Sequence, residues 1–219
     1  DEEARGWEPA DLQLGGAREV LLSTDLVGTA PTDSAPAPLE AAFARLEVIS
    51  PLTVRRSPST PEAPSVVCVL IDTLRADRLG CYGYERPTSP AIDALAARGT
   101  LFERALAPSS WTWPSTASLL TSLEPPHHGL VDHDACFLAN ELSTLPEAMQ
   151  RAGLHTAGFS VNPLVHSGRN FHQGFDLFEE YLWTPANEML GDVEDWIRSV
   201  GDDRFFLYLH VADPHGPYE

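Results

Sequence analysis

SVVCVLID, residues Ser65–Asp72, is the stretch that decides the fold. Within it, Val66–Ile71 is an unbroken apolar run rich in β-branched residues, which is typical of a strand covered on both faces in a parallel sheet. The run ends at Asp72, and open α/β sheets bind ligands just beyond the carboxyl ends of their strands. A buried carboxylate needs a cation or several hydrogen-bond donors. The alternative interpretation is that Asp72 only caps the turn that follows it.

A helix and then a strand are predicted directly downstream. Serine followed by proline is a common helix start and glycine a common end, which predicts a helix over Pro90–Arg98. We expect its apolar residues Ile92, Leu95 and Ala96 to face the core. Thr100–Ala105 then has the composition of a short strand.

A second helix is predicted to begin at Pro114, because proline is favoured in the first turn. This start places Thr112 at a helix N-terminus. The helix dipole and unpaired N–H groups there favour an alkoxide and the oxyanion of a bound tetrahedral group, so Thr112 is a candidate nucleophile. The alternative is that Thr112 merely caps the helix.

The order of helix and then strand repeats further along the chain. Thr144–Glu147 is a capping box for a helix that ends at Gly153, and a strand is predicted over His155–Val161. Apolar residues at helical spacing after Pro185 predict another helix, and Phe205–Val211 is a second buried-strand run. This alternation predicts an α/β fold with a mostly parallel sheet flanked by helices.

Composition divides the chain into three segments. Residues 1–54 contain two strand-like stretches, Arg18–Val27 and Ala42–Ile49, and are interpreted as the tail of a β-rich accessory domain. Residues 55–64, RRSPSTPEAP, have the composition of a stiff, solvated linker. Residues 65–219 form the main domain. Because the chain does not begin with methionine and ends soon after a strand-like run, we expect a truncated segment of a longer protein.

The charge of the chain limits its partners. Lys and Arg number 14 against 32 Asp and Glu, which gives a formal net charge of −18. Such a surface repels nucleic acid and anionic lipid, and it favours small cations. The three cysteines show no CxxC spacing, so neither a disulfide framework nor a zinc knuckle is indicated. No apolar run approaches the roughly 20 residues of a transmembrane helix.

Three polar residues follow predicted strands: Asp72, Thr112 and His215. Because the carboxyl ends of parallel strands share one edge of the sheet, we expect these side chains to converge. A divalent cation between Asp72 and Thr112 would lower the pKa of the hydroxyl and neutralise a substrate oxygen. The sequence therefore favours a metal-assisted nucleophile at this edge.

Four ordered motifs resemble the amino-terminal half of a sulfatase of the alkaline phosphatase superfamily, and the resemblance covers about Ser65–Glu219. The motifs are IDTLRADRLGCYGY (Ile71–Tyr84), TSPAIDALAARGTLFERA (Thr88–Ala105), SSWTWPSTASLLTSLEPPHHG (Ser109–Gly129) and FFLYLHVADPHGPY (Phe205–Tyr218). The resemblance implies an α/β fold of the alkaline phosphatase and sulfatase type.

The resemblance also implies a role for each matching residue. Asp72 matches the first metal-binding aspartate, Thr112 the nucleophile, and His215 a histidine that assists the leaving group. His210 lies earlier, in the predicted strand Phe205–Val211, and is placed to face the site, and Asn162 stands where the family carries a lysine. His210 and Asn162 are the implied substrate-binding residues. One divalent cation, Ca²⁺, Mg²⁺, Mn²⁺ or Zn²⁺, is the implied cofactor.

Departures from the family pattern limit which nucleophile and which substrate esters are expected. Sulfatases usually carry a cysteine that becomes formylglycine, whereas this chain has Thr112, so no formylglycine is expected. Thr116 replaces the arginine of the same motif, and Thr73 replaces a second aspartate. A threonine nucleophile resembles that of phosphoryl-transferring relatives. The implied substrate is a sulfate or phosphate ester of a small molecule, glycan or lipid, with no nucleic-acid partner.

The remaining metal ligands of the family lie in a later part of the fold. We therefore expect this segment alone to be inactive, because a Ca²⁺ or Mg²⁺ site needs about six ligands. The alternative is a catalytically degenerate domain that serves as a binding or scaffold module. An accessory β domain is more usual on exported proteins, which gives a lean toward the periplasm or the extracellular space.

Other polar residues have structural alternatives. His127 and His128 are adjacent on a turn, and packing of the loop is favoured over metal binding. Arg75 and Arg78 either bind an anionic group or pair with Asp77.

Overall fold

The computed structural model describes residues 19–23, 45–49, 56–132 and 137–216. The chain divides into two compact units, Asp1–Thr53 and Val54–Glu219. In the first unit, β1 (Glu19–Ser23) pairs antiparallel with β2 (Arg45–Ile49). A strand is thus present in each of the two predicted stretches of this unit, and the rest of both stretches lies outside the described residues. The three predicted domain segments and their boundaries stay predictions.

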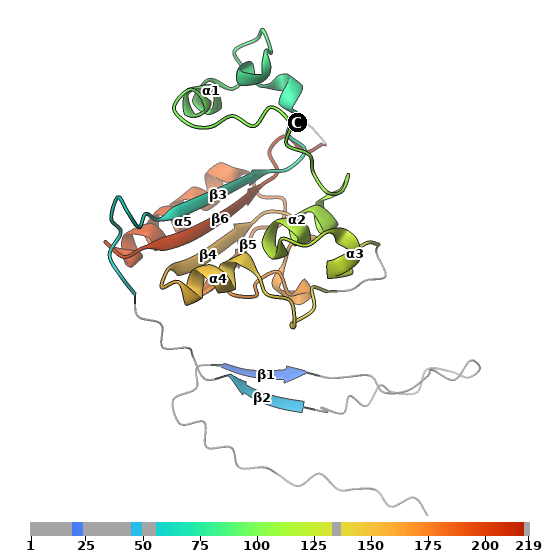
Figure 1. The fold of residues 1–219 in the computed structure, drawn as a ribbon, viewed down its shortest axis with the longest axis vertical. Coiled ribbons are helices and arrows are strands. Elements are labelled where there is room, and N and C mark those ends of the chain that lie inside the picture. The colour runs from blue at the N-terminus through green and yellow to red at the C-terminus, as the bar shows by residue number, and fades with distance from the viewer. Residues whose placement is uncertain (1–18, 24–44, 50–55, 133–136, 217–219) are drawn as a thin grey trace, which may run out of the picture. The chain divides into compact units, whose positions relative to one another are not determined.

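A four-stranded sheet forms the centre of the second unit (Figure 1). Its strands, in spatial order, are β3 (Val66–Ile71), β6 (Phe205–Val211), β4 (His155–Ser160) and β5 (Leu177–Glu180). Every neighbouring pair is parallel. The α/β fold with a parallel sheet is therefore confirmed, and all four carboxyl ends meet at one edge of the sheet.

Helices connect the strands and cover both faces of the sheet (Figure 1). The helices of this unit are α1 (Pro90–Ala96), α2 (Thr112–Thr121), α3 (Pro125–His128), α4 (Leu145–Arg151) and α5 (Ala186–Val200), of which α4 and α5 pack on opposite faces of the sheet. Short 3₁₀ turns occupy Ala76–Arg78, Gly80–Tyr82 and Ser167–Arg169. Among the described residues, no helix is long and apolar enough to cross a membrane.

Side chains that alternate along the strands make two cores, one on each face. On one face, Met189 and Val193 of α5 pack with Phe159 of β4 and Leu207 of β6. On the other face, Phe206 and Tyr208 of β6 pack against apolar residues of α4. This alternation matters for function because Tyr208, His210 and Asp72 then project on the face opposite α5.

The predicted helix starts are largely confirmed. Thr144 and Glu147 form the reciprocal capping box of α4, in which each side chain accepts a hydrogen bond from the backbone N–H of the other residue. The helix α2 begins at Thr112, two residues before the predicted start. Pro114 is tolerated as the third residue because the first four N–H groups of a helix have no intrahelical partner.

The expectation that β3 is covered on both faces is wrong for the described chain. Val67 and Val69 are 53% and 54% exposed, whereas Cys68 and Leu70 face the core. Within the described residues, β3 lies at the edge of the sheet and pairs only with β6. Because α5 packs over β4 and β6, it leaves the outer face of β3 open.

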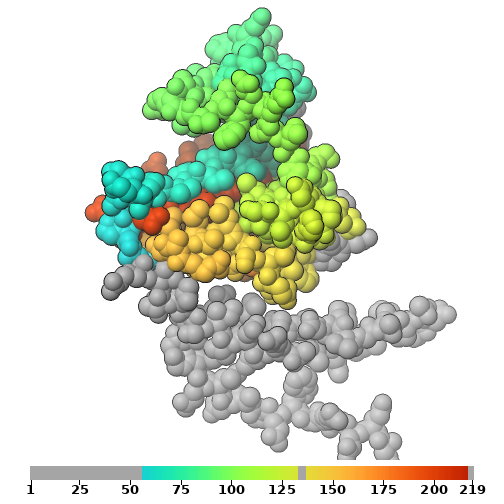
Figure 2. Space-filling view, in the orientation of Figure 1, coloured from blue at the N-terminus to red at the C-terminus, as the bar shows by residue number. Residues whose placement is uncertain are grey.

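Two expectations for the segment after β3 are also wrong. Thr100–Ala105 is not a strand, and in the described residues it has no neighbouring strand to bond with. Leu95 is 64% exposed, because α1 is fastened to the preceding 3₁₀ turn through Asp93, whose carboxylate accepts hydrogen bonds from Cys81 N and Ser89 Oγ. Figure 2 shows this segment, in teal and green, projecting from the body that carries the sheet.

The proline-rich segment at residues 56–64 is tied to the α/β unit. Arg56 forms an ion pair with Asp176 at 2.9 Å, and Ser59 N donates to Asp202 O at 2.7 Å. Its residues are mostly exposed, as the composition predicts, yet these bonds fix its path.

Candidate active site

Four elements bring polar side chains to the carboxyl edge of the sheet. Asp72 directly follows β3, and its N–H donates to Val211 O at 2.8 Å, which extends the parallel ladder by one residue. Thr112 is the first residue of α2, Asn162 follows β4, and His210 lies in β6. The Asp72 side chain is only 9% exposed, so its charge needs partners from the protein.

Three side chains bind the same oxygen of Asp72. Thr112 Oγ1 donates to Oδ2 at 3.0 Å, and Asn162 Nδ2 donates to it at 2.6 Å. His210 Nε2 lies 3.3 Å from the same atom. Among the described residues, no hydrogen bond reaches the second oxygen, Oδ1. The described residues thus fix the carboxylate through Oδ2.

A buried chain of polar groups stands behind Asp72. His210 is 0% exposed, and its Nδ1 lies 3.0 Å from the hydroxyl of Tyr208. Because Nε2 faces a carboxylate, it carries the proton, and Nδ1 then accepts from Tyr208. The side chain of Thr116 of α2 lies near the Tyr208 hydroxyl and acts to lower its pKa. His210 therefore reaches the site only through Asp72, and its buried position gives no support to the predicted contact with substrate.

The pKa values of this chain of groups are consistent with that arrangement. Burial acts to raise the pKa of Asp72, but the hydrogen bonds from His210, Thr112 and Asn162 hold it below its usual value. Complete burial raises the pKa of Tyr208 well above its usual value. At neutral pH Asp72 is an anion and Tyr208 a neutral donor.

The side-chain amide of Asn162 bonds to Asp72 through its nitrogen and to the backbone through its oxygen. Its side chain is nearly buried, and while Nδ2 binds Asp72, its Oδ1 accepts from Leu164 N at 2.8 Å. The second bond fixes the orientation of the amide. The substrate-binding role that the sequence predicts for Asn162 stays a prediction.

Thr112 lies at the N-terminus of α2, as the sequence predicts, and the rest of that helix anchors it. Trp113, Ala117 and Leu120 belong to a buried cluster, so one face of α2 is held in the core. The backbone of Thr112 is therefore positioned by packing, while its hydroxyl faces Asp72.

His215 is not part of this group of bonds. Its Nδ1 lies 2.6 Å from Gly216 O, and its ring centroid lies 4.9 Å from that of Trp183. The structure therefore brings together Asp72, Thr112, Asn162 and His210, and places His215 in a separate aromatic contact.

Sequence reasoning missed Tyr208 and Thr116. The period of a strand could have found Tyr208, because residues 208 and 210 share a face of β6 with Asp72 across the ladder. The sequence marks Thr116 only as the residue in place of the motif's arginine, and nothing in it indicates that Thr116 lies near Tyr208.

His128 belongs to the structural framework. Leu130 N donates to its Nδ1 at 3.1 Å, so Nε2 carries the proton and donates to Ser118 Oγ at 3.0 Å. Burial lowers the pKa of His128. In the described part of the chain, no three His, Cys, Asp or Glu side chains come together as a metal site.

The oxygen atoms at the carboxyl edge of the sheet are nevertheless of the chemical type that binds divalent cations. Asp72 Oδ1 and Thr112 Oγ1 are hard oxygen donors, and Oδ1 receives no hydrogen bond from the described residues. Ca²⁺ and Mg²⁺ take about six oxygen ligands, so these two atoms supply a part of such a site.

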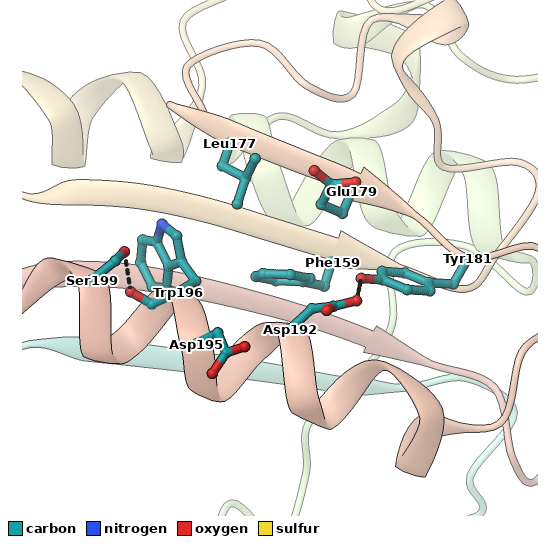
Figure 3. Close-up of a pocket in the computed structure, with 8 residues that line it drawn as sticks. All are labelled: Phe159, Leu177, Glu179, Tyr181, Asp192, Asp195, Trp196 and Ser199. Carbon is teal, nitrogen blue, oxygen red and sulfur yellow. Dashed lines mark hydrogen bonds between the residues drawn. The ribbon is translucent and has the colours of Figure 1, made fainter.

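A separate hollow of about 470 Å³ lies between α5 and the strands β4 and β5 (Figure 3). Tyr181 donates to Asp192 at 2.5 Å within it. Glu179 and Asp195 also line it, together with apolar and aromatic side chains. Three carboxylates repel a sulfate or phosphate group, so an anionic ester is better placed at the carboxyl edge of the sheet.

Comparison with known proteins fits this geometry. The family model "Sulfatase" matches residues 64–219. The chain belongs to the sulfatase family. Among curated sulfatases, iduronate 2-sulfatase of Homo sapiens is 34% identical over 128 residues, which covers 58% of this chain and 22% of that protein. The predicted resemblance is therefore confirmed.

Solved structures show the same fold. Phosphonate monoester hydrolase of Agrobacterium radiobacter superposes with a TM-score of 0.60 at 20% identity, covering 70% of this chain and 42% of that chain. The C-terminal periplasmic domain of EcEptC from Escherichia coli, in complex with Zn, gives a TM-score of 0.55 at 18% identity, covering 70% and 44%. This sulfatase-family chain spans less than half the length of each of these three relatives.

Proposed function

We propose that the chain carries the nucleophile of an ester hydrolase, in which Thr112 Oγ1 attacks a sulfate or phosphate ester. The observation that carries this proposal is the 3.0 Å contact of Thr112 Oγ1 with Asp72 Oδ2 at the N-terminus of α2. A helix N-terminus stabilises the negative charge that develops on the attacked group. Membership of the sulfatase family supports the same reaction class.

The reaction requires a new bond and two proton movements. Thr112 Oγ1 bonds to sulfur or phosphorus and loses its proton, and the leaving oxygen takes up a proton as its bond breaks. We assign that second proton to His215 on the family resemblance. Water then cleaves the threonyl ester and restores the hydroxyl.

Asp72 alone is a weak acceptor for the threonine proton, because its pKa is held below the usual value. A bound divalent cation, Ca²⁺, Mg²⁺, Mn²⁺ or Zn²⁺, would supply Lewis acidity that lowers the pKa of a hydroxyl beside it. Asp72 Oδ1 and Thr112 Oγ1 are the atoms that would hold it. The Zn complex of EcEptC, which has the same fold, supports a cation in this proposal.

Two arguments bear on the ester. The sulfatase relatives favour a sulfate ester of a glycan or small molecule. The threonine nucleophile favours phosphorus, and the shared fold with a phosphonate monoester hydrolase supports that class. Export is proposed because a fold relative is a periplasmic domain.

A second candidate is a degenerate module that binds but does not react. The observation in its favour is that three donors of the chain itself already compensate the charge of Asp72. Asn162 also stands in place of the lysine of the family. Activity measurements separate the two candidates.

The test uses the full-length protein with 4-nitrophenyl sulfate and bis(4-nitrophenyl) phosphate, each with Ca²⁺, Mg²⁺, Mn²⁺ or Zn²⁺ added. We expect Thr112→Ala to lose roughly a thousandfold or more in kcat/KM, as nucleophile removals do. The matched control is Ser118→Ala, which removes another hydroxyl from α2 and should keep activity. Equal activity in Thr112→Ala would remove the mechanism. Hydrolysis of neither ester with any cation would favour the binding module.

A further inference from the structure

A hollow of about 400 Å³ lies beyond the carboxyl ends of β3 and β6. Its lining residues are Thr73, Leu74, Arg75, Arg78, Asp213 and Pro214. Thr73 directly follows Asp72 in the chain, so the hollow and the proposed nucleophile site belong to the same carboxyl edge of the sheet.

The turn after Asp72 is held in an unusual conformation. Thr73 has φ +56°, in the left-handed region that β-branched residues rarely adopt. Such outliers persist only where the surrounding structure fixes them, and they concentrate at functional sites. The turn leads the chain into the 3₁₀ turn Ala76–Arg78, and thereby brings both arginines into the wall of the hollow.

Among the described residues, the two arginines that line the hollow differ in their ion pairs. Arg75 is paired with Asp77 through two hydrogen bonds of 2.9 and 2.7 Å. Asp213 Oδ1 accepts from Ala186 N at 3.3 Å, so its charge faces the N-terminus of α5. Arg78 contacts Tyr84 instead, with Nη1 3.3 Å from the hydroxyl and the guanidinium 5.3 Å from the ring centroid.

The guanidinium of Arg78 is thus oriented by its contacts with Tyr84 before any ligand binds. Within the described residues, no carboxylate lies at ion-pair distance from it, and the Tyr84 ring restricts its side chain. In a chain of net charge −18, an arginine placed this way beside the ester site is a local attraction for an anion. A guanidinium binds carboxylate, sulfate and phosphate groups through paired N–H donors.

We propose that this hollow holds a second anionic group of the substrate at Arg78, while the reacting ester lies at Thr112. The substrate class is then a sulfate or phosphate ester that carries another carboxylate, sulfate or phosphate. This inference rests on the proposed function, since it adds a subsite to the same reaction site.

The test measures binding to full-length protein with Thr112→Ala, which blocks turnover. The probes are alkyl sulfates whose chains of about two to six carbons end in a carboxylate, paired with the same sulfates capped as neutral amides. The range of chain lengths covers the unknown spacing between the two groups. We expect at least one carboxylate probe to bind about tenfold more tightly than its amide, as one charge-assisted hydrogen bond predicts.

Adding Arg78→Met to the Thr112→Ala protein should abolish that tenfold preference and leave the affinity for the amide probes unchanged. Added Arg98→Met, which removes another exposed arginine from the same segment, should preserve it. The subsite is overturned if the probes bind but carboxylate and amide bind equally, or if Arg78→Met keeps the preference. If no probe binds and no ester is hydrolysed by the unmodified protein, the proposed function fails, and the subsite fails with it.

Discussion

Two hydroxyls of one helix, Thr112 and Ser118, have opposite surroundings. Thr112 Oγ1 donates to an anion, Asp72, at an open edge of the sheet. Ser118 Oγ instead accepts from His128 Nε2, because Leu130 N occupies the other ring nitrogen. A serine beside a histidine resembles a catalytic pair, yet this histidine has no free lone pair with which to take a proton. The comparison teaches that the direction of each hydrogen bond, rather than closeness alone, separates a candidate nucleophile from a structural hydroxyl.

The largest effect should come from removing the charge beside Thr112. We expect Asp72→Asn to lower kcat/KM of the full-length protein by about a thousandfold or more, because the carboxylate positions Thr112 and is the proposed cation ligand. The amide oxygen can still accept hydrogen bonds, so the variant should fold, with a lower free energy of unfolding at neutral pH because the contribution of the carboxylate is lost. Retained activity in Asp72→Asn would contradict the role given to the carboxylate.

The two histidines should then differ in what they control. His210→Gln should lower activity by roughly 10- to 100-fold, because Asp72 loses a group that positions it. His128→Gln should cost about 1–3 kcal/mol of stability, from a buried bond left incomplete, with kcat/KM unchanged. Steady-state kinetics and denaturant unfolding of both variants measure this contrast. An equal loss of activity in the two variants would contradict the distinction between a positioning role for His210 and a structural role for His128.

The pH dependence of the free energy of unfolding should distinguish the surroundings of His128 from those of Asp72. The folded pKa of His128 is depressed, so its contribution is complete above about 6.5 and is lost as pH falls toward the folded value. The folded pKa of Asp72 is also depressed, so its contribution is complete above about 3.9 and is lost at lower pH. Unfolding free energies across pH should show His128→Gln flattening the first decline and Asp72→Asn the second. Unchanged profiles in both variants would refute these assignments.

The smallest effect should come from Thr116, the member of the buried series of polar groups that lies furthest from Asp72. Thr116→Val removes the buried hydroxyl that lies near Tyr208, and we expect a loss of about 1 kcal/mol in stability. Activity should fall by less than in His210→Gln, because Thr116 is two groups further from Asp72. Unfolding and kinetic measurements on the same preparation test this order, which a larger loss of activity in Thr116→Val would reverse.

Elements with strong local signals were predictable from sequence. The apolar run of β6 has the predicted bounds, and the capping box of Thr144 and Glu147 forms as expected. The approach of Asp72 to Thr112 is as predicted, but the predicted route is only half right, because Asp72 follows a strand whereas Thr112 is placed by the start of α2 and not by a strand at Thr100–Ala105. These features depend on rules that act within a few residues or on the sheet as a whole.

Features that depend on a particular neighbour were not predictable. The strand β5 is short and partly acidic, and it is accommodated by Gly158, where an added Cβ would lie 2.6 Å from the ring of Phe178. The Thr100–Ala105 segment has strand composition, yet no described strand lies beside it. The partners of Asp72 within β6 depend on the register between β3 and β6, which composition does not encode.

The most direct test of the central claim is to trap the modified nucleophile. Full-length protein is mixed with whichever aryl ester it hydrolyses, quenched in acid within the first turnovers, digested, and analysed by mass spectrometry. We predict a sulfate or phosphate group on Thr112 and an unmodified Ser118 in the same digest. Steady hydrolysis with no modification of Thr112, or with the group on another residue, would contradict the account.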